Sequence, residues 1–240
     1  MMSILLLLLI VGGPDTELIA SGDRSFREQR YSEAIGAYTR SIEQDRRNGE
    51  GYWRAVRAYI CLGDISEGTL RKQYYRDAYD LSEKALFADS MNSNVQCWYA
   101  VAMGYQALEE GSRRKVELCN SIKRSLERAI ELDPNNDVAY SIFGTFYRAL
   151  GNISWFERQL ADLLLGGLPP GGFAEAESML LKSVEIAPNI IRHRYELGLV
   201  YIDLGQKEKA SKVFTEALRL PQTIASDRER LIDIKKRLPL

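Results

Sequence analysis

One short phrase recurs at the ends of helical segments in this chain, and it constrains the fold more than any other feature. Residues 129–135 read Ala-Ile-Glu-Leu-Asp-Pro-Asn, residues 183–189 read Ser-Val-Glu-Ile-Ala-Pro-Asn, and residues 217–221 read Ala-Leu-Arg-Leu-Pro. Residues 41–46 and 85–90 are degenerate copies that lack the proline. Self-similarity at a period of roughly 20 to 50 residues is typical of repeat architectures, so the phrase predicts a stack of five units.

The unit from residue 191 to residue 223 shows what one repeat contains. Two apolar segments with helical spacing lie on either side of a break at Gly205, and Pro221 ends the second segment. This pattern predicts one helix hairpin per unit. The chain is therefore expected to be all-α, a right-handed α-solenoid of about five helix-turn-helix units. The apolar positions are Leu197, Val200, Tyr201 and Leu204 in the first helix and Ala210, Val213, Phe214, Ala217 and Leu218 in the second.

The units differ in length, which indicates insertions. Corresponding helix ends are spaced by 44, 44, 54 and 34 residues along the chain. The fourth unit is the longest because of an insert at residues 152–172, in which apolar residues at helical spacing precede a Gly- and Pro-rich stretch at 166–172. We expect an extra helix there, followed by a loop. The repeat domain should span residues 15–223, with a capping helix in residues 224–240.

Small residues recur where the two helices of a unit must approach closely, and they carry a family resemblance. A glycine inside a helix is unfavourable by about 1 kcal/mol relative to alanine, so its recurrence at one register indicates a packing requirement. With the other apolar positions of unit five, these residues resemble the tetratricopeptide repeat (TPR) family. The expected pairs are Gly22 with Ala34, Gly144 with Ala176, and Gly198 with Ala210.

A second resemblance is narrower. Residues 97–101 (Cys-Trp-Tyr-Ala-Val), residues 154–159 (Ser-Trp-Phe-Glu-Arg-Gln) and the unit-four insert look like the regulator of microtubule dynamics family, a divergent group of TPR-like proteins. The resemblance runs from about residue 30 to residue 225. It implies an association with microtubules and with mitochondrial or other organelle membranes, as in animal members of that family.

Composition excludes several classes of function. The formal net charge is −1, which gives no overall field that would favour nucleic acid. The single histidine, His193, and the cysteines Cys61, Cys97 and Cys119 do not have the spacing of a zinc site, and no nucleophile motif can be paired with His193. We therefore expect no metal, no cofactor and no enzymatic activity. The cysteines are expected to act as small buried apolar residues.

The N-terminal residues 1–14 leave two interpretations open. Residues 4–11 form an apolar run of eight, too short to cross a bilayer as a helix. The run is either a degenerate export signal or weak membrane tether, or the apolar start of a helix packed on the first repeat. The protein would be exported or membrane-tethered in the first case and cytoplasmic in the second.

The expected function is a non-enzymatic scaffold that binds a protein or peptide segment. The partner would lie along the concave face or on the insert, where Trp155 is the expected contact. The alternatives are a self-associating structural protein and, by family resemblance, an adaptor associated with microtubules or organelle membranes. If the family register holds, the groove residues are Ser141, Thr145, Arg148, Arg192, Tyr195, Leu199 and Asp203.

Overall fold

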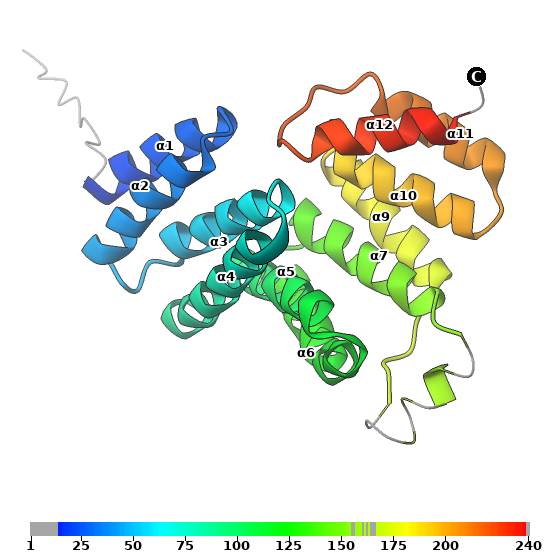
Figure 1. Ribbon diagram of the computed structural model, residues 1–240, viewed down its shortest axis with the longest axis horizontal. Coiled ribbons are helices and arrows are strands. Elements are labelled where there is room, and N and C mark those ends of the chain that lie inside the picture. Colours follow the sequence, from blue (N-terminus) through cyan, green and yellow to red (C-terminus); the bar gives the residue numbers. More distant parts are fainter. Residues whose placement is uncertain (1–13, 155–156, 160, 162, 164–166, 239–240) are drawn as a thin grey trace, which may run out of the picture.

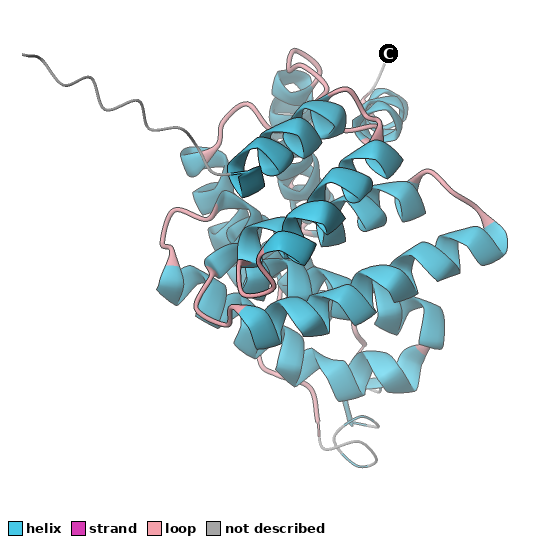
Figure 2. Cartoon of the chain, turned by 90° about the vertical axis from the view of Figure 1, so that its left-hand side faces the viewer, coloured by secondary structure: helices cyan, strands magenta, loops and turns pink. Residues whose placement is uncertain are grey.

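The computed structural model describes residues 14–154, 157–159, 161, 163 and 167–238. Within these residues the chain contains helices and no strand, and successive helices pair into five hairpins (Figure 1). Figure 2 shows the same helices from the side, packed in layers and joined by loops. The predicted all-α solenoid of five helix pairs is confirmed. The pairs are α1 (Pro14–Arg27) with α2 (Tyr31–Gln44), α3 (Gly49–Asp64) with α4 (Gly68–Ala88), α5 (Ser93–Glu110) with α6 (Ser112–Leu132), α7 (Asp137–Gly151) with α9 (Phe173–Ile186), and α10 (Ile191–Asp203) with α11 (Lys207–Ala217).

Glycines in the first helices let a large side chain of the second helix lie directly on the backbone. A Cβ atom added at Gly198 would collide with the ring of Phe214, and one added at Gly22 would collide with the ring of Tyr38. The small-residue positions are thus right, but the close partner is the large residue four positions after the expected alanine. In unit two, the ring of Tyr75 in α4 packs in the same way on the backbone of Gly63 in α3.

The unit-four insert is partly described. Residues 157–159, 161 and 163 are helical, as expected, and Trp155 lies outside the described residues. Arg158 fastens the insert, because its guanidinium donates to the carbonyls of Leu150 at 3.0 Å and Pro169 at 3.3 Å. The loop ends at Gly171, whose φ of +126° suits glycine and which packs against the ring of Tyr147.

The C-terminal helix α12 (Asp227–Arg237) packs on α10, the first helix of unit five. Ile234 of α12 is fully buried in the same core cluster as Leu199, and the Tyr195 hydroxyl donates to Asp233 at 2.9 Å. The segment before α12 runs back toward the N-terminal helices (Figure 1). There the amide of Ala225 donates to the Tyr31 hydroxyl at 2.9 Å. The segment before α12 thus contacts the first unit.

No helix in the described part of the chain is long and apolar enough to cross a membrane. Residues 4–11, where a weak tether was expected, lie outside the described residues.

Candidate functional site

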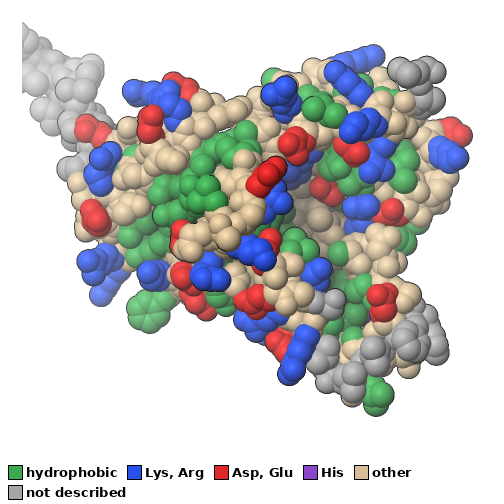
Figure 3. Space-filling view, in the orientation of Figure 1, with side chains coloured by type: hydrophobic (Ala, Val, Ile, Leu, Met, Phe, Trp, Pro, Cys, Tyr) green, Lys and Arg blue, Asp and Glu red, His purple; other side chains and the backbone are tan. Residues whose placement is uncertain are grey.

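The first helices of all five units converge on one cavity of about 390 Å³. Segment 223–227, before and at the start of α12, forms another part of its wall. Seen from the face in Figure 3, the molecule is hollowed between its N-terminal and C-terminal units, with charged side chains of both signs around the hollow. The cavity is lined by Asp23, Phe26 and Arg27 of α1, Trp53, Arg54, Arg57 and Cys61 of α3, Trp98 of α5, Asp137 and Val138 of α7, Ile190 and Arg192 at the start of α10, and Thr223, Ile224 and Asp227.

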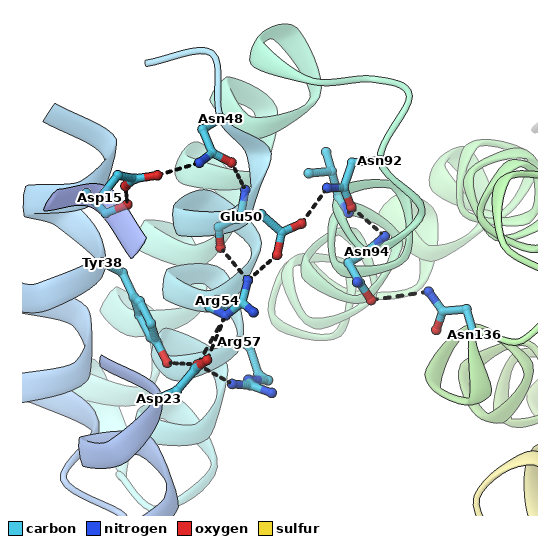
Figure 4. Close-up of polar contacts among 12 residues, drawn as sticks. Asp15, Asp23, Tyr38, Asn48, Glu50, Arg54, Arg57, Asn92, Asn94 and Asn136 are labelled. Carbon is cyan, nitrogen blue, oxygen red and sulfur yellow. Dashed lines mark hydrogen bonds and ion pairs between the residues drawn. The ribbon is translucent and has the colours of Figure 1, made fainter. Parts of the chain in front are cut away.

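Asp23 organises the N-terminal wall of this cavity (Figure 4). Its carboxylate accepts hydrogen bonds from the Tyr38 hydroxyl at 2.7 Å and from Arg54 Nε at 3.1 Å. Arg54 also pairs with Glu50 one helical turn earlier. Arg57 lies farther away, with 3.8 Å between its Nη2 atom and Oδ1 of Asp23. The Asp23 carboxylate therefore faces two guanidinium groups. Arg54 forms hydrogen bonds with it, whereas Arg57 lies at ion-pair distance only.

Arg57 is held by aromatic rings more than by hydrogen bonds. Its guanidinium carbon lies 3.8 Å from the centre of the Phe26 ring and 5.1 Å from that of Trp53. Such stacking suits guanidinium, which is planar and more weakly hydrated than ammonium. The Nε atom of Arg57 is buried and has no hydrogen-bond acceptor among the described residues. Burial lowers the pKa of Arg57, but an arginine remains charged in a folded protein.

The opposite wall carries a second guanidinium of this kind. Arg192 Nε is also buried without a hydrogen-bond acceptor in the described part of the chain. Beside it, His193 is fully buried, and its Nε2 lies 2.7 Å from an Asp137 carboxylate oxygen. Burial, together with the charges of Arg192 and Arg194, lowers the pKa of His193 against the opposing effect of Asp137. Burial disfavours the Asp137 carboxylate, but His193 and Arg192 outweigh that effect and its pKa is lowered.

The neutral groups of the cavity suit binding better than covalent chemistry. Cys61 is buried, and desolvation raises its pKa to about 12, so its thiol stays protonated near neutral pH. Among the described residues no group of three or more His, Cys, Asp or Glu side chains could hold a metal ion. What the cavity offers is guanidinium donors next to aromatic rings.

Of the seven groove residues predicted from the register, Arg192 alone lines the cavity. Arg148 and Asp203 form an ion pair with each other at 2.6 Å. Tyr195 is engaged by Asp233 of α12, and Leu199 is part of the core beneath that helix. In unit five the concave side is covered by α12, which the register does not reveal.

The remaining two predicted residues lie deeper in unit four. Ser141 is fully buried, and its hydroxyl is without a hydrogen-bond partner among the described residues. Thr145, one turn later, donates its hydroxyl to the Ser141 carbonyl at 3.0 Å. Neither residue faces the cavity, so a role for them in binding a partner stays a prediction.

Sequence reasoning missed the N-terminal wall, which carries most of the arginines. Arg54 and Arg57 are three residues apart and so share one face of α3, which was the available signal. Their neighbours Phe26 and Trp53 come from different helices, and the sequence alone does not bring them together.

A ladder of asparagines that sequence reasoning also missed fixes the spacing of these walls (Figure 4). Asn48, Asn92 and Asn136 are 44 residues apart and each is the N-cap of a first helix. Asn92 accepts hydrogen bonds from two amides of α5 and donates to Glu50 at 2.8 Å, in the unit before. Asn136 likewise donates to the Ser93 hydroxyl at 2.8 Å. Each cap thus joins its own helix to the preceding unit.

Comparison with solved structures confirms the repeat fold. A thermophilic TPR protein of Thermus thermophilus superposes with a TM-score of 0.67 at 14% identity, covering 93% of this chain and 98% of that one. Yeast Tom70 superposes with a TM-score of 0.56 at 14% identity, covering 93% of this chain and 39% of Tom70. The fold of this chain is therefore TPR-like.

Sequence comparison identifies closer relatives. Regulator of microtubule dynamics protein 2 of Homo sapiens is 32% identical over 211 residues, which are 87% of this chain and 52% of that protein. The Rattus norvegicus protein of the same description is 32% identical over 189 residues, 78% of this chain and 46% of the relative. This chain thus spans about half the length of the curated relatives it matches. The family model described as "Regulator of microtubule dynamics protein 1-3" matches residues 18–239, and the chain belongs to that family.

Proposed function

We propose that this protein is a non-enzymatic scaffold that binds a segment of a partner protein in the cavity on its concave face. The observation that carries the proposal is the convergence of five first helices and the segment before α12 on one cavity. A pre-formed concave surface binds an extended or helical segment without having to order itself first.

The location of the cavity can be tested by site-specific photocrosslinking in the full-length chain. Arg27 is an exposed residue on the rim of the cavity, and Arg40 is an exposed residue of α2 that does not line it. Replacing Arg27 with benzoylphenylalanine should trap partner proteins in an extract of the native cells. The same replacement at Arg40 should not. Equal trapping at both positions would move the binding site away from the cavity.

The groove residues predicted in units four and five have a place in this proposal. Arg192 would contact the bound segment directly. A partner that reached Tyr195 or Leu199 would first have to displace α12, which covers them. Ser141, Thr145, Arg148 and Asp203 would support the wall, and Trp155 of the insert would be a second contact outside the cavity.

Self-association is a second candidate, favoured by apolar side chains exposed near the end of α4. Phe87 is 95% exposed and Met91 is 64% exposed. The tryptophans of units two and three, Trp53 and Trp98, are buried within the chain. Sedimentation at several concentrations tests this candidate, because a self-associating protein changes mass with its own concentration. Phe87→Ser should abolish such a change.

The third candidate follows from family membership. The relatives are named as regulators of microtubule dynamics, and by that relationship this chain would act as an adaptor on microtubules or organelle membranes. Co-sedimentation of the purified chain with polymerised tubulin tests it directly. A chain that stays in the supernatant at all tubulin concentrations would leave the scaffold proposal without this role.

A further inference from the structure

The outer face of α4 ends in an aromatic side chain that is almost entirely exposed. Phe87 is 95% exposed, and Met91, shortly after the helix, is 64% exposed. A hollow of about 630 Å³ opens beside the Phe87 ring, between α4 and the segment that joins α2 to α3. One surface thus carries both a projecting ring and a hollow next to it. The other residues that line the hollow are Arg46, Tyr52, Asp80, Glu83, Lys84 and Ala88.

The surface is built mainly from one face of α4. Asp80, Glu83, Lys84 and Phe87 are spaced by three or four residues, so they lie on the same side of the helix, and all four are exposed. None of the residues that line the hollow also lines the cavity between the first helices. A partner that covered this face of α4 would therefore contact none of the residues of the cavity wall.

The charges of the hollow balance one another. Arg46 and Lys84 are positive, and Asp80 and Glu83 are negative. None of the four forms an ion pair within the described part of the chain, although Asp80 and Lys84 lie one helical turn apart. Glu83 accepts a single hydrogen bond, from the Tyr79 hydroxyl at 3.1 Å. All four charges are thus free to pair with groups from another molecule.

The charges around the hollow are mixed as well. Arg128, whose Nη2 donates to the sulfur of Met91 at 3.2 Å, is paired with Glu131 at 3.1 Å. A surface of both signs and almost no net charge can meet a second copy of itself with each charge near an opposite one. The other charged neighbours in the sequence are Asp45 and Arg47 beside Arg46, Arg76 and Asp77 one turn before Asp80, and Asp89 after Ala88.

Other kinds of partner fit this surface less well. An acidic partner would face Asp80 and Glu83, a basic one would face Arg46 and Lys84, and like charges across an interface are unfavourable. The apolar run at residues 4–11 would take the four charges out of water without giving them partners. A second copy supplies both the opposite charges and an aromatic ring for the hollow.

We propose that the outer face of α4 is an interface between two copies of this chain, with Phe87 of each copy packed into the hollow of the other. The charges then pair across the interface, because Arg46 and Lys84 of one copy face Asp80 and Glu83 of the other. The proposal rests on the self-association candidate above and names its surface. Such a dimer presents two cavities, so a partner with two binding segments is held more tightly than by one chain.

An exchange of charges tests the interface and leaves Phe87 in place. The acidic variant, Arg46→Glu with Lys84→Glu, and the basic variant, Asp80→Lys with Glu83→Lys, each give the hollow a single sign. In analytical ultracentrifugation the unmodified full chain should gain mass with concentration. Each variant alone should dimerise about tenfold more weakly or not at all, because like charges meet. An equimolar mixture of the two variants should recover the dimer.

The control for this test reverses two charges elsewhere. Lys207 and Lys212 are exposed on α11, in unit five, and line none of the hollow. Lys207→Glu with Lys212→Glu should dimerise like the unmodified chain. Unchanged melting temperatures and helical circular dichroism would show that all of the variants fold.

Photocrosslinking of the purified full chain locates the contact. Benzoylphenylalanine in place of Phe87 should give a covalent dimer. The same replacement at Leu108 should not: Leu108 is also exposed, at 62%, but lies near the other end of α4, where Glu109 pairs with Lys72 at 3.4 Å.

Each outcome decides for or against the interface. An unmodified chain that stays monomeric, or a mixture of the acidic and basic variants that does not dimerise, would overturn it. Crosslinks from position 87 to residues 1–13 of the same chain, without a dimer, would assign the hollow to the N-terminal segment instead. Trapping of partner proteins through benzoylphenylalanine at position 27 should be the same in the acidic variant, so a failure of the cavity proposal would be seen separately.

Discussion

At the scale of single residues, the glycines inside the helices divide into two kinds. Gly198 carries the ring of Phe214 directly on its backbone, whereas Gly36 of α2 has open space where a side chain would stand. Gly198→Ala should therefore lower the free energy of unfolding by about 1–3 kcal/mol through overpacking. Gly36→Ala should raise it by about 0.4–1 kcal/mol through the lower entropy of the unfolded chain. Urea denaturation of both variants measures the difference. Destabilisation by Gly36→Ala as well would contradict the argument that only glycines in contact with a large side chain resist substitution.

His193 gives the molecule an assignable pH dependence, because it is the one histidine in the sequence. Burial lowers its pKa below the ordinary value of 6.5, so the unfolded chain binds a proton that the folded chain does not. The contribution of His193 to the free energy of unfolding should thus be constant above that value, and it should fall as the pH drops below it. The lowered pKa of Asp137 adds a further loss at more acidic pH, when that carboxylate is protonated.

The measurement is urea denaturation between pH 5 and 8, where no other side chain with an ordinary pKa titrates. His193→Gln keeps an amide donor near Asp137 but cannot titrate. The variant should lose the decline just below pH 6.5. A decline of the same size in the variant would assign the pH dependence to another group.

At the scale of helices, the N-cap asparagines make each unit depend on the one before it. Asn136 caps α7 and reaches back to Ser93, and it is only 5% exposed. Asn136→Ala should cost about 2 kcal/mol, since it removes a helix cap and a buried hydrogen bond. Asn135→Ala is the matched control, because its side chain is exposed and the substitution should stay within about 0.5 kcal/mol. Thermal unfolding of both variants gives the comparison.

The sequence predicts the helix pairs well and the site poorly, for physical reasons. The Pro-ended phrase and the apolar spacing are local signals, and they place the hairpins and the loop of the insert. The cavity depends on contacts between residues that are far apart in the sequence. Phe26 of α1 stacks on Arg57 of α3, and Ile224 lines the same cavity as α3. Those contacts depend on the curvature of the whole solenoid and on the path of residues 218–226, where the sequence has no repeat pattern. The prediction that Tyr195 lies in the groove could not take account of α12, which covers that side chain in the structure.

At the scale of the whole molecule, the contact between the two ends is the feature that most separates this chain from an open solenoid. In an open array each repeat contacts only its neighbours, so end units can unfold by themselves. Here Ile224 and Ala225 pack against the core of unit one, and Tyr31 accepts a hydrogen bond from Ala225. The segment before α12 therefore couples unit one to unit five and closes one side of the cavity.

Weakening that contact should let unit one open independently. Ile224→Ser combined with Tyr31→Phe removes both the apolar packing and the hydrogen-bond acceptor, so amides of α1 and α2 should exchange with deuterium faster while those of α5 and α7 keep their protection. Ile232→Ser is the matched control, because Ile232 is 45% exposed on α12 and does not touch unit one's core cluster. Since unit one carries Asp23, Phe26 and Arg27 of the cavity wall, the double variant should also trap less partner protein through benzoylphenylalanine at position 27. Uniform loss of protection along the whole chain would instead mean that the five units unfold as one, and that the end-to-end contact stabilises all of them equally.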